Sequence, residues 1–433
     1  MLKIIDKNKK SFKQDFLKIF KNRESTGKNI DSISREIIEN VKKKSDNAIV
    51  DYTIKFDNFK IKKFDNLVVS TKEIEQAFKI TDRKVLKALR HAMSRIRNYH
   101  KRQLPKNELY TDNEGVSLGV QWHPVSSVGC YVPGGKASYP SSVLMNVIPA
   151  QVAGVKRIVM VVPTPSGFVN PTILAAAKLL KIKEIYKIGG AQAVAALAYG
   201  TKFIKKVDKI CGPGNAYVAS AKKQVFGTVG IDMIAGPSEI LVVADKYNNP
   251  KHIAIDLLSQ AEHDELAQSI LITDDINFAN SVNKCLNEEL KKLERRRIAE
   301  ASCKNFGAII LVQNIRDSIQ LINEISPEHL ELSFKNCERF LKKINNAGAI
   351  FIGKYTPEAI GDYIAGPNHV LPTNKTSRFS SGLNVLDFMK RTSLVKCSFN
   401  SLKKIGPDAI NLAEEEGLGA HALSIRTRIE NKE

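Results

Sequence analysis

The sequence predicts an α/β protein with two parallel-sheet domains, a helical N-terminal segment and a helical C-terminal tail. The first observation is length, because 433 residues with 43% hydrophobic content exceed the roughly 250 to 300 residues that one core usually serves. The second is a repeated alternation of short β-rich apolar runs with helical patterns from Val120 onward. Such alternation is typical of parallel sheets covered by helices on both faces. We therefore expect both domains to be Rossmann-like, each an incomplete doubly wound sheet.

The first 110 residues have a helical and basic pattern. In segment 85–96, apolar residues recur every three or four positions, which indicates an amphipathic helix. We expect residues 1–30 to form a helical arm. We expect residues 31–130 to join residues 239–380 in one α/β domain, which carries most of the candidate metal and catalytic residues.

Between those two segments, the chain predicts an inserted α/β domain over residues 131–238. Its expected strands lie at 157–163 and 185–188, and its expected helices at 173–180 and 191–198. After Ser238 the alternation resumes. We expect the later strands at 240–244, 270–273, 308–312 and 349–352, with helices between them.

The last segment, residues 381–433, is a tail with one or two helices. It is too short to build a core of its own. It must therefore dock on another surface, either the body of its own chain or a partner subunit.

Charge and cysteine content limit the possible partners and compartments. The formal net charge is +21 and the pI is about 9.5, which would suit a nucleic acid. However, the basic runs are short, and aromatic residues are not interleaved with them as a base-stacking surface needs, so we expect no nucleic-acid partner. Neither a signal peptide nor a membrane-spanning run is evident, and the six cysteines are scattered. We expect a cytoplasmic protein with reduced thiols and no membrane partner.

Gln260 and His263 are candidate metal ligands. They lie three positions apart on a predicted helix, so their side chains can converge on one point. With Asp362 and His421 they would form a mixed nitrogen and oxygen set that suits zinc and, less selectively, manganese or cobalt. A Gln-x-x-His pair alone is more often a solvated helix face, so the spacing leaves both interpretations open.

Glu328 and His329 are candidate proton-transfer groups. They follow Pro327, which favours a tight turn that could bring both side chains to one substrate. A histidine titrates near neutrality, and burial can raise a glutamate toward it, so the pair suits proton transfer and water activation. An ordinary surface turn with a satisfied histidine is the alternative.

Three glycine-rich tracts, at 131–135, 189–192 and 211–215, precede or open helical patterns. Backbone N–H groups there could hold phosphate. The tract 417–422 fits the looser G-x-G-x-x-A form, but it has no strand before it and too little chain after it. We therefore reject it as a dinucleotide site.

Six longer tracts carry a family resemblance. From about residue 30 to residue 428, the chain resembles the histidinol dehydrogenase family. The matching tracts are 129–135, 212–218, 235–239, 256–264, 326–330 and 416–421.

The resemblance implies oxidation of L-histidinol to L-histidine through L-histidinaldehyde, by two hydride transfers to NAD, with one zinc ion per subunit. It implies that His329 takes the hydroxyl proton and that Glu328 activates the water that hydrates the aldehyde. It also implies a homodimer in which the tail crosses to the partner, so that Glu416 and His421 complete the other subunit's site. The implied zinc ligands are Gln260, His263, Asp362 and His421. The implied substrate-binding residues are Ser238, Gln260, His263, His329, Asp362, Glu416 and His421. The implied NAD contacts are Tyr131, Gln192 and Asn215.

Two alternatives remain at this point. A relative on the same scaffold could oxidise another small polar alcohol, such as a sulfonated diol. A catalytically silent basic protein that binds nucleic acid is the rival from another class. The joint presence of metal, base and water-activating candidates argues against the second.

Overall fold

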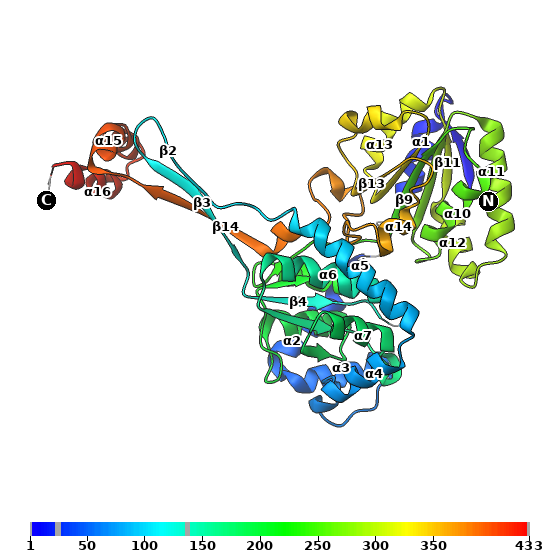
Figure 1. The fold of residues 1–433 in the computed structure, drawn as a ribbon, viewed down its shortest axis with the longest axis horizontal. Coiled ribbons are helices and arrows are strands. Elements are labelled where there is room, and N and C mark those ends of the chain that lie inside the picture. The colour runs from blue at the N-terminus through cyan, green and yellow to red at the C-terminus, as the bar shows by residue number, and fades with distance from the viewer. Residues whose placement is uncertain (1, 22–26, 135–138, 431–433) are drawn as a thin grey trace.

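The computed structural model describes residues 2–21, 27–134 and 139–430. Figure 1 shows two α/β bodies and a long arm that leads away from both to the C-terminal helices. None of the helices in the described ranges is long and apolar enough to cross a membrane.

The first body contains a six-stranded parallel sheet in the order β1-β11-β10-β9-β12-β13. Its strands are β1 (Lys3–Asp6), β9 (Glu239–Ala244), β10 (Gln268–Thr273), β11 (Ala308–Leu311), β12 (His329–Ser333) and β13 (Ala349–Ile352). Every residue of β9, β10 and β12 is buried, which is why β9 and β10 contain the apolar runs 240–244 and 270–272, whereas β12 buries polar residues as well. Helices cover both faces: α10 (Pro250–Ala261), α11 (Ile276–Leu290) and α12 (Arg296–Phe306) on one, α1 (Phe12–Lys21) and α13 (Ser318–Ile325) on the other.

The second body contains a five-stranded parallel sheet in the order β6-β5-β4-β7-β8. Its strands are β4 (Ser127–Tyr131), β5 (Arg157–Val161), β6 (Glu184–Tyr186), β7 (Lys209–Cys211) and β8 (Gly230–Ile231). One face packs against α4 (Thr71–Ile80), α5 (Arg83–Lys101), α6 (Pro140–Ala153) and α7 (Pro171–Leu179). The other packs against α2 (Gly27–Lys44), α3 (Asp46–Asp57), α8 (Gly190–Tyr199) and α9 (Ala216–Val225).

The N-terminal residues are assigned to the two bodies differently from the expectation in two respects. Helices α2 to α5 pack on the five-stranded sheet, although residues 31–130 were expected to join the other body. Their apolar faces contact α7, α6, α8 and α9, and a hydrophobic period shows that a face is buried without showing against what. In addition, the expected helical arm of residues 1–30 contains β1, which pairs with β11 at the edge of the six-stranded sheet.

The arm is a three-stranded antiparallel sheet followed by two helices. Strands β2 (Glu108–Thr111), β3 (Ser117–Pro124) and β14 (Met389–Lys396) pair in the order β14-β3-β2. Helices α15 (Phe399–Glu415) and α16 (Gly419–Glu430) pack on each other at its far end (Figure 1). Leu109, Val395 and Leu412 on this arm are 67%, 69% and 67% exposed, so the arm presents apolar surface to its surroundings.

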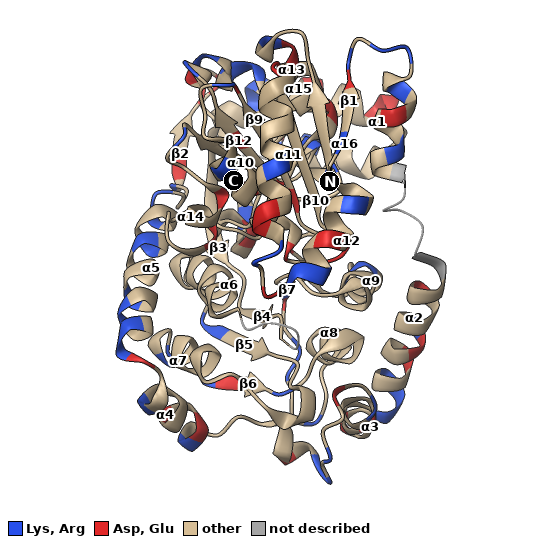
Figure 2. Cartoon of the chain, turned by 90° about the vertical axis from the view of Figure 1, so that its right-hand side faces the viewer, with Lys and Arg blue, Asp and Glu red and all other residues tan. Residues whose placement is uncertain are grey.

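Charged residues of both signs are spread over both bodies. Figure 2 shows Lys and Arg on α4, α5 and α12, with Asp and Glu on several of the same elements.

Candidate active site

Glu328 and His329 lie at the amino end of β12, beside the amino end of β9. Helix α13 ends in a left-handed residue, Ser326 (φ 51°), and Pro327 then leads directly to the pair. The N–H of Glu239 donates to Glu328 Oε2 at 2.8 Å, and His329 Nδ1 lies 2.9 Å from the carbonyl oxygen of Glu239. The side chains of Glu328 and His329 therefore both contact the backbone of Glu239 on the neighbouring strand, and these contacts hold the two side chains at the same edge of the sheet.

The same contact sets the proton position on His329. A carbonyl oxygen can only accept, so Nδ1 carries the hydrogen and Nε2 keeps its lone pair. Nε2 is buried, with no hydrogen-bond partner among the described residues. Burial lowers the pKa of His329, although Asp362 partly opposes this. His329 is thus a neutral imidazole whose free nitrogen can accept a proton.

Glu328 is also buried, and its pKa is raised well above the ordinary value. Loss of solvation is the main cause, and the negative charge of Glu239 adds to it. A carboxylate whose pKa is raised in this way holds a proton more readily, which favours a role as acceptor from water.

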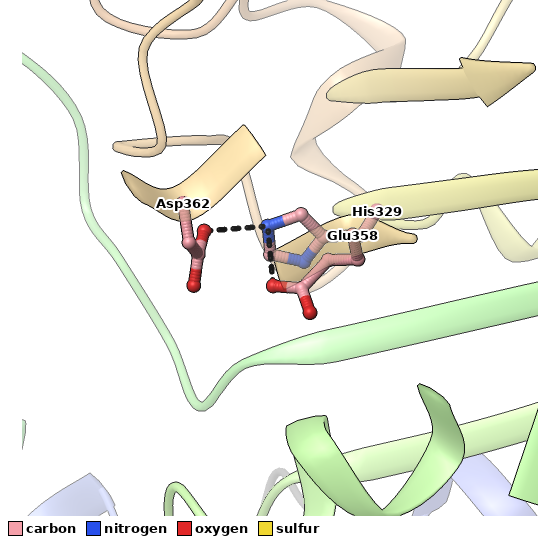
Figure 3. Close-up of side chains that lie close together, drawn as sticks. All are labelled: His329, Glu358 and Asp362. Atoms are coloured by element: carbon pink, nitrogen blue, oxygen red, sulfur yellow. Dashed lines mark ion pairs between the residues drawn. The ribbon is translucent and has the colours of Figure 1, made fainter. Parts of the chain in front are cut away.

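Glu358 and Asp362 form a compact group of possible metal-ligand atoms with His329 Nε2 (Figure 3). Nε2 lies 3.8 Å from Glu358 Oε1 and 3.9 Å from Asp362 Oδ1, and the donor atoms of the three residues lie within 4.8 Å of one another. Glu358 and Asp362 stand four positions apart on α14 (Glu358–Tyr363), so they share one helix face. Glu358 was not among the predicted site residues, but its spacing from Asp362 could have indicated it.

Gln260 and His263 carry buried atoms that no described residue satisfies. Helix α10 ends at Ala261, so His263 lies in the following turn and not on the helix, with its N–H donating to the carbonyl of Gln260 at 3.2 Å. Gln260 Oε1 and His263 Nδ1 are both buried without a hydrogen-bond partner in the described parts of the chain. Ser259, which precedes Gln260 on α10, donates from its hydroxyl to Glu358 Oε2 at 3.4 Å, so this end of α10 lies beside α14. Buried polar atoms normally find partners, and such a group of unpaired acceptors fits a cation.

Ser142 and His369 connect this group to the second body. His369 Nδ1 lies 2.9 Å from the carbonyl oxygen of Asp362, and its Nε2 lies 3.4 Å from Ser142 Oγ on α6. The candidate site therefore faces the junction of the two bodies. Neither residue could be singled out from the sequence, because the contacts of His369 with Asp362 and of Ser142 with His369 come from tertiary packing.

The remaining predicted substrate residues are divided between the body and the arm. Ser238 precedes β9, and its carbonyl accepts from the N–H of Gln268 at 2.9 Å. Glu416 and His421 are exposed on the helices at the tip of the arm, far from α14 within the same chain (Figure 1). The fold of one chain does not bring these two residues to the others.

The predicted NAD contacts gather at the carboxyl edge of the five-stranded sheet. Tyr131 ends β4, and its hydroxyl accepts from the N–H of Gly190 at 3.0 Å. Gln192 is buried on α8 with Oε1 unpaired among the described residues, and Asn215 caps α9. Strand order reverses between β4 and β7, and dinucleotides bind at such switch points in doubly wound sheets.

Comparison with known proteins identifies the family. The sequence model of histidinol dehydrogenase matches residues 20–429. A histidinol dehydrogenase of Rhodospirillum rubrum is 55% identical over 419 residues, covering 96% of each chain, and one of Brucella suis is 54% identical over 418 residues, covering 96% of this chain and 97% of the relative. The chain belongs to the histidinol dehydrogenase family.

A solved structure agrees with this assignment. The crystal structure of histidinol dehydrogenase from Elizabethkingia anophelis has a TM-score of 0.92 and 36% identity, covering 99% of this chain and 98% of that one. The predicted α/β class of parallel sheets and the predicted family are confirmed. As a member of the histidinol dehydrogenase family, the chain is an oxidoreductase.

In this histidinol dehydrogenase family member, Glu358 also belongs to a group of three hydrogen-bonded acidic residues, with Glu331 and Asp256. Glu331 on β12 hydrogen-bonds to Asp256 on α10, and its Oε1 accepts from the N–H of Glu358 at 2.5 Å. Burial raises the pKa of Asp256 to about 6, of Glu331 to about 8 and of Glu358 to about 9. These three carboxyl groups are therefore largely protonated below neutral pH.

These raised pKa values predict the pH dependence of stability. A carboxyl group whose pKa is raised by folding contributes its full stabilisation at pH values below its pKa in the unfolded chain. That stabilisation is lost as the pH rises through its pKa in the folded protein. We expect the metal-stripped protein to lose free energy of unfolding as the pH rises from about 4 to 9, by up to about 1.4 kcal/mol per pH unit for each proton involved. Glu331→Gln keeps an acceptor for Glu358 N–H and removes one ionisation, so its loss should be smaller. Denaturant unfolding from pH 5 to 9 measures this, with the exposed Glu300→Gln as control. Parallel curves for Glu331→Gln and the control would refute it.

Proposed function

We propose that this chain oxidises L-histidinol to L-histidine through L-histidinaldehyde, with reduction of two NAD per substrate and uptake of one water. The observation that carries the proposal is the free Nε2 of His329, a ready proton acceptor next to Glu358, together with the unpaired acceptor atoms of Gln260 and His263 at the end of α10 that also contacts Glu358. A base next to a cation site suits an alcohol whose neighbouring groups must be held in place.

Gln260, His263 and Asp362 would hold a zinc ion, together with His421 of a second copy of the chain. The support is the chemistry of the possible ligand atoms: unpaired buried oxygen and nitrogen atoms of Gln260 and His263 at the end of α10, and the carboxylates of Glu358 and Asp362 on the neighbouring helix α14. When bound, zinc would anchor the imidazole and amine of the substrate and so orient its carbinol. We assign His329 to proton transfer and not to the metal, because its Nε2 is the free base of the site.

His329 would act in both oxidations. Its Nε2 takes the hydroxyl proton of histidinol in the first, and the hydroxyl proton of the hydrated aldehyde in the second. Glu328 would take a proton from the water that adds to the aldehyde. Because both side chains are anchored on Glu239, each acts without reorganising the other.

NAD would bind at the carboxyl edge of the five-stranded sheet through Tyr131, Gln192 and Asn215, and it accepts the hydride. The support is the switch point between β4 and β7, together with the unpaired buried Oε1 of Gln192.

A second copy of the chain would complete each site with Glu416 and His421. The support is the arm, which carries both residues away from their own body and exposes Leu109, Val395 and Leu412. Apolar surface of this kind favours burial against a partner, and a symmetric dimer would exchange the two arms equally.

The stoichiometry of the reaction tests the proposal. We expect two NADH per L-histidinol consumed, none after removal of the metal by a chelator, and recovery on addition of zinc. NADH absorbance and amino-acid analysis measure the two quantities. One NADH per substrate would contradict aldehyde oxidation at this site. No NADH from the zinc-loaded protein would refute histidinol as substrate and favour another small polar alcohol.

A further inference from the structure

A buried ion pair in the second body plays no part in the chemistry described so far. Lys222 on α9 pairs with Asp232, which follows β8, and their side chains are 2% and 0% exposed. Burying two charges costs solvation energy that the pair itself recovers only in part, so such a pair is weak evidence for a role in stability. The role of the pair must therefore be sought in the hydrogen bonds that it makes to other residues.

Those bonds converge on Gly212. The N–H of Gly212 donates to Asp232 Oδ2 at 2.8 Å, and Lys222 Nζ donates to the carbonyl oxygen of Gly212 at 3.0 Å. Both backbone polar groups of one residue are thus held by the two members of one ion pair. The N–H of Asp232 in turn donates to the carbonyl of Ile210 on β7 at 3.1 Å, which ties the pair to the sheet.

Position 212 requires a glycine. Its φ is +107°, in the region that favours glycine, and an added Cβ would lie 2.1 Å from the carbonyl oxygen of Tyr131. The residue therefore sits directly against the end of β4. Three residues later, Asn215 caps α9 by accepting from the N–H groups of Tyr217 and Val218, both at 3.1 Å.

We propose that the Lys222–Asp232 pair is a positioning element for dinucleotide binding: it clamps Gly212 against Tyr131 and so fixes the tract 212–215 at the switch point of the sheet. This inference rests on the proposed use of NAD at that edge. The clamp sets where the chain leaves β7, and hence where the first turn of α9 meets the phosphates of the cofactor. Neither side chain touches the cofactor, because both are enclosed.

The direct test is NAD affinity measured by titration calorimetry on the zinc-loaded enzyme. Lys222→Met with Asp232→Asn removes both charges and leaves Asn Oδ1 to accept from Gly212. We expect the Kd for NAD to rise roughly 10-fold, the factor that corresponds to losing about 1.4 kcal/mol of phosphate binding at the first turn of α9. The Kd for L-histidinol and the zinc content should remain at wild-type values, a split that general destabilisation would not produce.

The Arg157–Glu184 pair offers a matched control. It joins β5 and β6 of the same sheet at 2.8 Å, but it lies at their amino ends, the edge opposite the switch point. Arg157→Met with Glu184→Gln should leave the Kd for NAD unchanged. Lys222→Arg is a second, milder variant that keeps the charge but displaces the donor to Gly212, and it should weaken NAD binding if the first variant does not fold.

The outcomes separate the inference from the proposed function. If wild-type protein binds no NAD, the proposed use of NAD is wrong. If wild-type protein binds NAD and the folded Lys222 variants bind it equally well, or the control weakens it as much, the positioning role is wrong.

Discussion

His329→Asn is expected to slow both oxidation steps by about 10²- to 10⁴-fold, the usual contribution of a positioned base. Asparagine can still donate to the carbonyl oxygen of Glu239 in place of Nδ1, but it has no nitrogen at the position of Nε2. The fold and the binding groups should therefore persist while the proton acceptor is lost. Steady-state rates with L-histidinol, and separately with L-histidinaldehyde, measure the two steps.

Glu328→Gln is the matched variant for that experiment. Glutamine still accepts from the N–H of Glu239 but cannot take a proton from water. We expect a large loss on the aldehyde and a small one on the alcohol. Equal losses on both substrates in both variants would contradict the division of labour between the two residues.

Mixed dimers should recover activity that neither parent variant has. His421→Ala removes a ligand supplied by the arm, and His329→Asn removes the base supplied by the body, so each homodimer should be nearly inactive. A heterodimer of the two has one site with both residues intact, and we expect about half of the wild-type activity. Co-expression with two different affinity tags and tandem purification provides the heterodimer.

A control heterodimer shows what activity to expect when neither site is intact. Heterodimers of His329→Asn and Glu328→Gln carry both changes on the body, so no site is intact and no recovery is expected. Full activity of the His421→Ala homodimer, or no recovery in the mixed dimer, would refute an active site shared between two arms and two bodies.

Local sequence rules singled out some of the candidate site residues and missed others. Glu328 and His329 could be found because they are adjacent. Gln260 and His263 were proposed from a helical three-residue spacing, although α10 ends at Ala261 and His263 lies in the following turn. Glu358 lies four positions before Asp362 on α14, so a spacing rule could have indicated it. His369 could not be singled out in this way, since only the packing of the loop after α14 brings it to Asp362.

The division of the chain into bodies was harder to predict for a related reason. The alternating runs after Val120 indicated parallel sheets, because continuous apolar strands are buried on both faces. The partners of α2 to α5 depend on which apolar faces meet, and no periodicity contains that information. The short strand β1 carries too few residues for a pattern, and its partner β11 lies about 300 residues further on in the chain.

That distant pairing has a consequence for synthesis on the ribosome. The N-terminal strand must wait for β11 to emerge, and at about 5 to 20 residues per second the delay is roughly 15 to 60 seconds. All strands of the five-stranded sheet emerge within that interval, so the second body can fold first. Leu2 and Ile5, which are buried in the finished protein, meanwhile stay exposed in the nascent chain, where chaperones recognise apolar segments. The middle of the polypeptide can therefore fold before its N-terminal strand is in place, although that strand is synthesised first.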